Sequence, residues 1–201
     1  MTKQSGYSTP LAIKLAILIA TVPLGWNLRA VTAQQREPGF QPLFNGKDLT
    51  GWRVKTQPLD GQAESPDGRF KAQAGAIVIQ GGKPIIDLYT VREFPRNFVL
   101  RLEFRAQAGA NSGLHIRGKQ LQVRDYPALG PYKDLKRYKA NDWNQIEVQV
   151  KKDEQGKSHA TCTCNGEVLE SALAVPDNGG IGLQSETNQI EYRRIELKEL
   201  D

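Results

Sequence analysis

The stretch from Gly109 to Asp125 carries the residues best suited to chemistry in this sequence. Read as two strands, it alternates apolar residues with polar ones. Successive side chains of a strand point to opposite faces, so one face of the sheet would carry an imidazole, two guanidiniums, an amide and a carboxylate. These groups belong to His115, Arg117, Gln122, Arg124 and, after a slight turn, Asp125.

Such a face is suited to holding a polar ligand and to moving a proton. His115 is one of two histidines in the chain, and an unperturbed imidazole titrates closest to neutral pH. It is therefore the best candidate for a general base. A lone histidine on a polar strand is also commonly just solvated or hydrogen-bonded, and Asn111 and Ser112 before it could simply form a turn.

Short runs with a period of two surround this stretch and predict an all-β antiparallel sandwich or barrel. The clearest run is 98–105, where four apolar residues alternate with Arg101, Glu103 and Arg105. Turn signals such as Asn165-Gly166 separate the runs, and no window of a dozen residues has convincing helical periodicity. The other predicted strands are 76–80, 143–150, 158–164, 167–169, 180–184 and 190–197.

The first 33 residues have the features of an export signal. Lys3 and Lys14 precede an apolar run over 15–24, and Val31-Thr-Ala33 has the form of a cleavage site. The run is about half of the ~20 residues that span a bilayer, so an uncleaved anchor is the weaker alternative. We therefore expect a secreted or periplasmic protein without stable membrane insertion after cleavage, organised as a signal peptide over 1–33, a linker over 34–38 and one domain over 39–201.

The composition of the remaining chain argues against nucleic acid as a partner and against a disulfide. Removing the three basic residues of the leader lowers the formal net charge from +5 to +2, and no basic stripe interleaved with aromatics occurs. Cys162 and Cys164 would lie roughly 7 Å apart on one face of a strand, too far for an unstrained disulfide. We expect both cysteines in the core. We also expect Trp52 and Trp143 there, the alternative for the two tryptophans being platforms that stack on a sugar.

Seven motifs follow one another over nearly all of residues 39–200. They are GFxPLFNGKDLxGW from Gly39, LRLEFR from Leu100, GANSG from Gly109, NDWN from Asn141, CNG from Cys164, GGIGLQ from Gly179 and YRRI from Tyr192. In this order they resemble the 3-keto-disaccharide hydrolase domain family, also described as 3-keto-glucoside 1,2-lyase and hydratase. The resemblance implies a concanavalin A-like jelly-roll β-sandwich and an extracytoplasmic protein that acts on carbohydrate.

The resemblance also implies a reaction. A ketone at C3 of a sugar acidifies the C2 proton, its removal gives an enolate, the glycosidic oxygen leaves C1, and water adds to the resulting enone. A base, a cation beside the C3 oxygen and a proton donor are needed. The catalytic candidates are His115, Glu103, Asp125 and Glu186, and the substrate-binding candidates are Asn111, Ser112, Arg105, Arg117, Gln122, Arg124, Gln184 and Tyr132.

Two features of this proposed site stay open at the level of sequence. A divalent metal held by His115, Asp125 and Glu186 is plausible chemically, but no spacing requires it. Tyr132 and the neighbouring Tyr126 and Tyr138 are candidates for lying over a sugar ring.

The sequence departs from the family pattern at two places. Family members often carry His-Gly directly after the closing Gly-Leu-Gln, whereas Ser185-Glu186-Thr187 follows here. The second strand of the site often reads like Tyr-Glu-Val-Gln, but here it is Leu121-Gln-Val-Arg124. Either Glu186 takes the role of the histidine or that role is lost.

Three alternatives follow for the function and the site. The domain could be a noncatalytic carbohydrate-binding module of the same fold. It could instead be a conventional glycoside hydrolase that uses two opposed carboxylates. Independently of both, Glu103 and Arg105 could form only cross-strand ion pairs.

Overall fold

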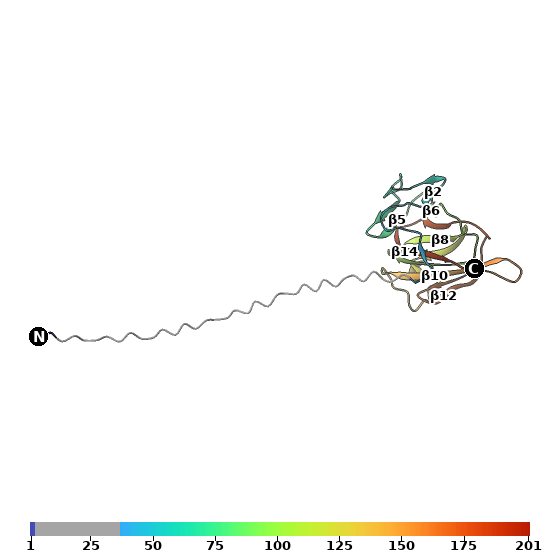
Figure 1. The fold of residues 1–201 in the computed structure, drawn as a ribbon. Coiled ribbons are helices and arrows are strands. Elements are labelled where there is room, and N and C mark those ends of the chain that lie inside the picture. The colour runs from blue at the N-terminus through green and yellow to red at the C-terminus, as the bar shows by residue number, and fades with distance from the viewer. Residues whose placement is uncertain (3–36) are drawn as a thin grey trace. The chain divides into compact units, whose positions relative to one another are not determined.

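The computed structural model describes residues 1–2 and 37–201, and residues 37–201 form a sandwich of two antiparallel sheets (Figure 1). The predicted signal peptide over 1–33 and most of the linker over 34–38 lie outside the described residues. In the part of the chain that is described, no helix is long and apolar enough to cross a membrane. The predicted all-β sandwich is confirmed, and its one helix is the four-residue α1 (Tyr126–Leu129).

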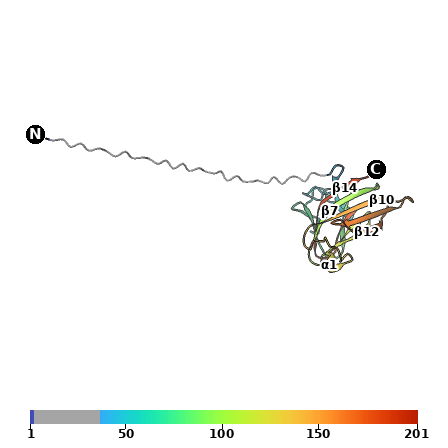
Figure 2. The same ribbon diagram turned by 90° about the horizontal axis from the view of Figure 1, so that it is seen from below.

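Sheet A contains eight strands. They are β1 (Gln41–Pro42), β4 (Phe70–Gln73), β5 (Ala76–Gln80), β7 (Phe98–Ala106), β10 (Asn144–Lys152), β11 (Ser158–Cys164), β12 (Glu167–Ala174) and β14 (Gln189–Glu199). Seven of them follow one another in the order β12-β11-β10-β7-β14-β5-β4, and β1 pairs with β14. Figure 2 shows β7, β10, β12 and β14 running alongside one another, with α1 away from them.

Sheet B contains six strands and covers the other side of the core. They are β2 (Trp52–Val54), β3 (Gln57–Pro58), β6 (Ile86–Thr90), β8 (Asn111–Ile116), β9 (Lys119–Arg124) and β13 (Ile181–Ser185). Their order in the sheet is β3-β2-β6-β13-β8-β9. Strands distant in sequence therefore become neighbours, and β13 brings residues 181–185 between β6 and β8.

The core lies between the inner faces of the two sheets. Along β7, every second residue from Phe98 to Ala106 is buried, as its period of two predicts. Cys162 and Cys164 are buried free thiols, as expected, and burial raises the pKa of each to about 12. Trp52 is also buried, but the prediction for Trp143 is wrong, since this residue is only partly buried, on the outer face of sheet A.

A tight turn joins β8 to β9, so the alternation predicted from the sequence does not continue through this point. Ile116 pairs with Lys119, so the hairpin loop consists of Arg117 and Gly118. Both have positive φ, 53° and 89°, as Asn165 and Gly166 do in the predicted β11–β12 hairpin. Because Arg117 is a turn residue rather than a strand residue, its side chain does not lie on the polar face of β8, whose last residue is His115.

Candidate functional site

Polar side chains cross the outer face of sheet B, which is the face turned away from the core. Cross-strand pairing arranges them in rows. The first row is Arg53, Tyr89, Gly182, His115 and Gln120; the second holds Asp87 beside Gln184 and Gly113 beside Gln122; the third holds Asn111 beside Arg124. We call this set the sheet B site.

His115 is held by two residues of β6. Its ring centroid lies 5.5 Å from that of Tyr89, and its Nε2 lies 3.4 Å from Oδ2 of Asp87. The histidine is only 8% exposed. Burial and the charge on Asp87 raise the pKa of the Tyr89 hydroxyl, so it keeps its proton. An imidazole beside a carboxylate is an arrangement suited to accepting a proton.

Two glycines let larger side chains lie against the sheet. A Cβ on Gly182 would stand 2.6 Å from the Tyr89 ring, so only glycine leaves room for that ring beside His115. A Cβ on Gly113 would stand 2.2 Å from Nε2 of Gln120, which crosses this position and donates a hydrogen bond of 2.8 Å to Oε1 of Gln184. Because Gly182 and Gly113 have no side chain, the Tyr89 ring and the Gln120 side chain can lie against the sheet in the sheet B site.

The sheet B site contains most of the buried polar atoms that lack a hydrogen-bond partner in the described residues, although one of them, Nε2 of His115, lies 3.4 Å from Oδ2 of Asp87. In the described part of the chain, eight buried side-chain nitrogen or oxygen atoms have no hydrogen-bond partner, and six belong to this face. Most buried polar groups in proteins are hydrogen-bonded, and each unpaired one costs about 1–3 kcal/mol. The six are Asp87 Oδ1, Asn111 Oδ1, both ring nitrogens of His115, Gln122 Oε1 and Arg124 Nε.

The far end of the sheet B site is formed by Asn111 and its surroundings. Asn111 exchanges two backbone hydrogen bonds with Thr187. Glu186 lies between Thr187 and the end of β13 at Ser185. Asp125 Oδ2 accepts the backbone N–H of Gly109 at 2.9 Å, which fixes the turn before β8. Because Asn111 and His115 are four residues apart on β8, the two ends are separated by roughly 13 Å.

This separation bears on the predicted metal ligands. His115 lies at one end of the sheet B site, whereas Asp125 and Glu186 lie beyond the other end. The described residues contain no group of three or more His, Cys, Asp or Glu side chains that could hold a metal ion. The donor set named from the sequence therefore does not fit a shared metal centre.

Comparison with known proteins identifies the domain. The family model of the 3-keto-alpha-glucoside-1,2-lyase-like domain matches residues 39–198. The chain belongs to this family. The family is one of carbohydrate-active, glycosyl hydrolase-like domains, which agrees with the resemblance read from the motifs.

Solved structures support the fold. Two proteins from Parabacteroides distasonis, both provisionally named glycosyl hydrolases, are similar to this chain. One is 20% identical with a TM-score of 0.63, covering 81% of this chain and 94% of the other. The second is 19% identical with a TM-score of 0.60, covering 80% and 99% respectively. A comparison with curated proteins gave no match.

Within this family domain, Arg117 does not join the sheet B site. It is 3% exposed, and its guanidinium donates hydrogen bonds to the backbone oxygens of Phe94, Pro176 and Arg96 and to Oγ of Ser158. Its surroundings are loops at the edge of the sandwich rather than the outer face of a sheet. The prediction that Arg117 contacts substrate is therefore wrong in its placement, because the turn directs the side chain inward.

Ser112 also points inward. It alternates with Asn111 and Gly113 on β8 and is fully buried between the sheets. Its hydroxyl donates to the backbone oxygen of Gln184 at 2.7 Å and lies 2.9 Å from the Tyr192 hydroxyl. Ser112 is thus a buried structural link, whereas Gln184 itself faces the site.

The three tyrosines proposed to cover a sugar ring pack against one another. Tyr132 and Tyr138 both contact the buried Tyr126 edge-on, with centroids 5.4 and 5.5 Å away. The Tyr132 hydroxyl donates to Glu170 at 2.6 Å. Burial, and then the bond to Glu170, raise the pKa of Tyr132. Tyr132 therefore closes the edge of the sandwich instead of lining the sheet B site.

Glu103 and Arg105 lie on the other sheet. Both face outward from β7 in sheet A, and Glu103 accepts hydrogen bonds from Arg193 at 2.6 Å and Arg194 at 2.8 Å. Arg105 donates to Glu191 at 2.7 Å. The alternative that they form ion pairs is confirmed, and their grouping with His115 is wrong because the core separates the two outer faces.

Sequence reasoning missed Asp87 and Tyr89. Both lie on β6, which was not among the predicted strands. The signal was present, because Ile86-Asp87-Leu88-Tyr89-Thr90 alternates between apolar or small and polar residues with a period of two. What the sequence alone could not supply is the pairing of β6 with β13, which brings Asp87 to His115.

Proposed function

We propose that this domain cleaves 3-keto-glycosides by elimination followed by rehydration. The observation that carries the proposal is the set of six buried polar atoms, spread over the outer face of sheet B from His115 to Arg124, that have no hydrogen-bond partner in the protein. Membership of a 3-keto-alpha-glucoside-1,2-lyase-like family supports the substrate class. A polar, hydroxyl-rich ligand would supply the hydrogen bonds that the protein does not make itself.

In the proposed reaction His115 removes the proton from C2. The C–H electrons pass into the enolate on the C3 oxygen, then form the C1–C2 double bond as the C1–O bond breaks. The leaving oxygen takes up a proton and departs as an alcohol. Water then adds across the double bond, placing its hydroxyl on C1 and a proton on C2, so the net change is hydrolysis.

The surrounding residues have distinct proposed roles. The carboxylate of Asp87, 3.4 Å from Nε2, stabilises the imidazolium that forms when His115 accepts the proton. Tyr89 keeps its hydroxyl proton and is a candidate proton donor on the same face. Arg124, Asn111 and Gln122, at the far end, provide charge and amides for the second sugar ring.

A direct turnover assay tests the proposal. The purified protein is incubated with a 3-keto-disaccharide and, in parallel, with the unoxidised disaccharide, while enone absorbance and released monosaccharide are followed. We expect turnover of the oxidised sugar alone. Turnover of the unoxidised glycoside would indicate a conventional glycosidase, and saturable binding without turnover would indicate a binding module; either result overturns the proposal.

The two histidines offer a matched pair of variants. His115→Ala is expected to lower turnover by about 10²–10⁴-fold, the usual contribution of a general base. His159→Ala changes the histidine that pairs with Asp153 at 3.0 Å on β11, away from the sheet B site, and is expected to retain wild-type turnover. Equal activity of both variants would remove His115 from the mechanism.

A metal requirement is tested separately. Because the candidate ligands are not gathered into one group, no step above is assigned to a metal. We expect turnover to survive treatment with EDTA. A loss of activity that a divalent cation restores would show that the site takes a metal through other ligands.

We also propose that the protein acts outside the cytoplasm, on the basis of the leader-like residues 1–33. Cell fractionation followed by N-terminal sequencing tests this. A mature protein that begins near Gln34 in the extracytoplasmic fraction is expected. An intact N-terminus in the cytoplasm would contradict it.

A further inference from the structure

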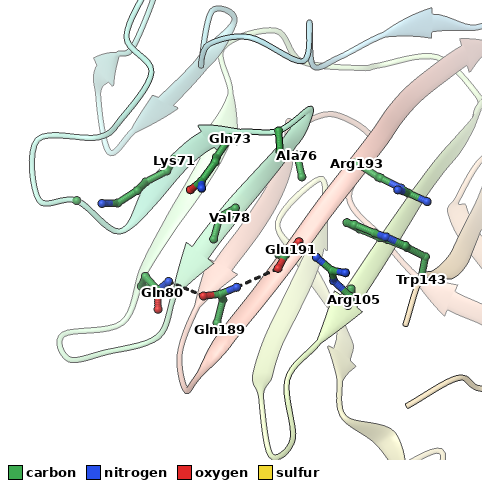
Figure 3. Close-up of a pocket in the computed structure, with 12 residues that line it drawn as sticks. Lys71, Gln73, Ala76, Val78, Gln80, Arg105, Trp143, Gln189, Glu191 and Arg193 are labelled. Carbon is green, nitrogen blue, oxygen red and sulfur yellow. Dashed lines mark hydrogen bonds and ion pairs between the residues drawn. The ribbon is translucent and has the colours of Figure 1, made fainter. Parts of the chain in front are cut away.

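A hollow of about 740 Å³ lies on the outer face of sheet A, opposite the sheet B site (Figure 3). Its floor is low because β5 places Ala76 and Val78 between long side chains of β4 and β14. It extends across β4, β5, β14 and β7, which is roughly 14 Å at the usual spacing of strands. This is room for more than one sugar ring.

A stack of aromatic and cationic side chains borders the hollow. The guanidinium of Arg193 lies 3.8 Å from the centroid of the Trp143 ring, and that of Arg105 lies 4.8 Å from it. A second hollow of about 400 Å³ shares Trp143 and Arg193 with the first. Stacking fixes the planes of the two guanidiniums, so little further ordering is needed when a ligand binds.

In the two arginine pairs at the hollow, the arginine is more exposed than its glutamate. The Arg105 side chain is 40% exposed and its partner Glu191 only 15%. Arg193 is 32% exposed and its partner Glu103 only 18%. A guanidinium has five N–H donors, and each of these pairs occupies one, so several donors remain for a ligand.

The rest of the lining suits sugar hydroxyls. Lys71 on β4 adds a third cation; its Nζ lies 3.0 Å from Oε1 of Glu64, and the two side chains are 40% and 48% exposed. Gln73, Gln80 and Gln189 contribute amides that both donate and accept, and Gln80 and Gln189 are already ordered by a hydrogen bond of 2.8 Å. Figure 3 shows Lys71 and Gln73 across β5 from Gln189 and Glu191.

We propose that this hollow is a second binding site that takes an acidic oligosaccharide. The carboxylates of the sugar acids would pair with Arg105, Arg193 and Lys71, since a guanidinium matches a carboxylate in charge and in its two-donor geometry. The amides would bind the hydroxyls of the same chain. This second site is separate from the sheet B site, and the proposal does not depend on the function proposed for the sheet B site. By binding there, a charged polysaccharide would anchor the domain.

Calorimetric titration of the full chain tests this proposal. The probe is a tetramer of galacturonic acid, and the comparison is a neutral glucose tetramer of equal length. We expect saturable binding of the acidic tetramer that weakens as salt rises, and binding of the neutral tetramer that is at least tenfold weaker. Equal binding of both, or no saturable binding of the acidic one, would overturn the proposal.

Variants place the ligand on one face or the other. The double variant Arg105→Gln/Arg193→Gln is expected to raise the Kd for the acidic tetramer by about tenfold or more. Arg92→Gln removes another exposed arginine paired with a glutamate, outside the hollow, and should stay within about twofold. His115→Ala should bind the tetramer as the wild type does, and loss of binding in it would move the ligand to sheet B.

A steric variant guards against misfolding of the double variant. Val78→Trp fills the floor of the hollow and leaves every ion pair in place. It is expected to weaken binding of the acidic tetramer while the thermal unfolding midpoint stays close to that of the wild type. Undiminished binding in a folded Val78→Trp protein would exclude the hollow as the site.

Discussion

The two outer faces of the sandwich handle polar side chains in opposite ways. On sheet A the charged residues satisfy one another, as in the pairs of Arg105 with Glu191 and of Arg193 with Glu103, at 2.7 and 2.6 Å. On sheet B six buried polar atoms have no hydrogen-bond partner in the protein. The same strand periodicity therefore produced one face whose charged residues pair with one another and one face whose buried polar atoms lack hydrogen-bond partners in the protein.

The difference between the two faces bears on how much their polar groups contribute to the free energy of unfolding. Exposed ion pairs contribute about 0–1 kcal/mol, whereas an unpaired buried polar group costs about 1–3 kcal/mol. The sheet A face is thus nearly neutral for folding, whereas the polar atoms of the sheet B face depend on a ligand or on water for their hydrogen bonds. Preorganised sites commonly carry this kind of cost.

The largest expected effect separates two arginines that the sequence had grouped together. Arg117→Ala leaves several buried carbonyl groups without donors and is expected to cost about 3–5 kcal/mol of unfolding free energy. Arg124→Ala, on the sheet B site, is expected to cost less than about 1 kcal/mol and to weaken substrate binding instead. Denaturant unfolding and KM measurements check both, and equal stabilities would contradict the assignment of Arg117 to the framework.

The next effect compares one carboxylate on each face. Asp87→Asn removes the charge beside His115 and is expected to lower turnover by roughly 10–100-fold with little change in KM, because the imidazolium loses its partner. Glu103→Gln makes the equivalent change on sheet A and is expected to leave turnover unchanged. If Glu103→Gln is the more damaging of the two in kcat, the site has been placed on the wrong sheet.

The sequence was sufficient for β5, for every strand from β7 onward and for most of the polar face, but not for β1 to β4 and β6 or for the relation between distant strands. His115, Gln122 and Arg124 were predicted on one face because two adjacent strands and their alternation are local properties. Glu103 was placed with them wrongly, since alternation says which residues of β7 share a face and nothing about which sheet β7 joins. Asp87 was missed because β6 was not predicted as a strand, and the pairing of β6 with β13 is not a local property either.

Arg117 shows a second limit of sequence reasoning. A two-residue hairpin loop usually signals itself by Asn-Gly or Asp-Gly, as Asn165-Gly166 does here. Arg117-Gly118 takes the same positive φ values without that signal. The alternation was therefore extended one residue too far. The energy that holds Arg117 in this conformation comes from tertiary hydrogen bonds, which no local pattern records.

A smaller effect tests the stability cost of the sheet B site. Gln122→Met removes an unpartnered buried amide oxygen and keeps the side-chain volume, so we expect a gain of about 0.5–1.5 kcal/mol in unfolding free energy together with weaker substrate binding. Gln145→Met changes an exposed glutamine on the outer face of sheet A and should alter neither. Destabilisation by Gln122→Met would show that its amide is already satisfied, for example by bound water.

The smallest expected effect concerns the ion pairs of sheet A outside the hollow. Arg101 Nε lies 2.7 Å from Glu147 Oε2, and the guanidinium stacks on Phe40 at 4.4 Å. A double-mutant cycle with Arg101→Gln and Glu147→Gln is expected to give a coupling energy below about 1 kcal/mol that falls further as salt rises.

The salt dependence is what makes this last cycle informative. Glu147 is 42% exposed, so solvent screens its pair with Arg101, and added ions screen it further. A coupling above about 2 kcal/mol that persists at high salt would mean that sheet A also depends on desolvated charge. The two faces would then still differ in which polar groups are paired. They would no longer differ in how much their polar groups contribute to the free energy of unfolding.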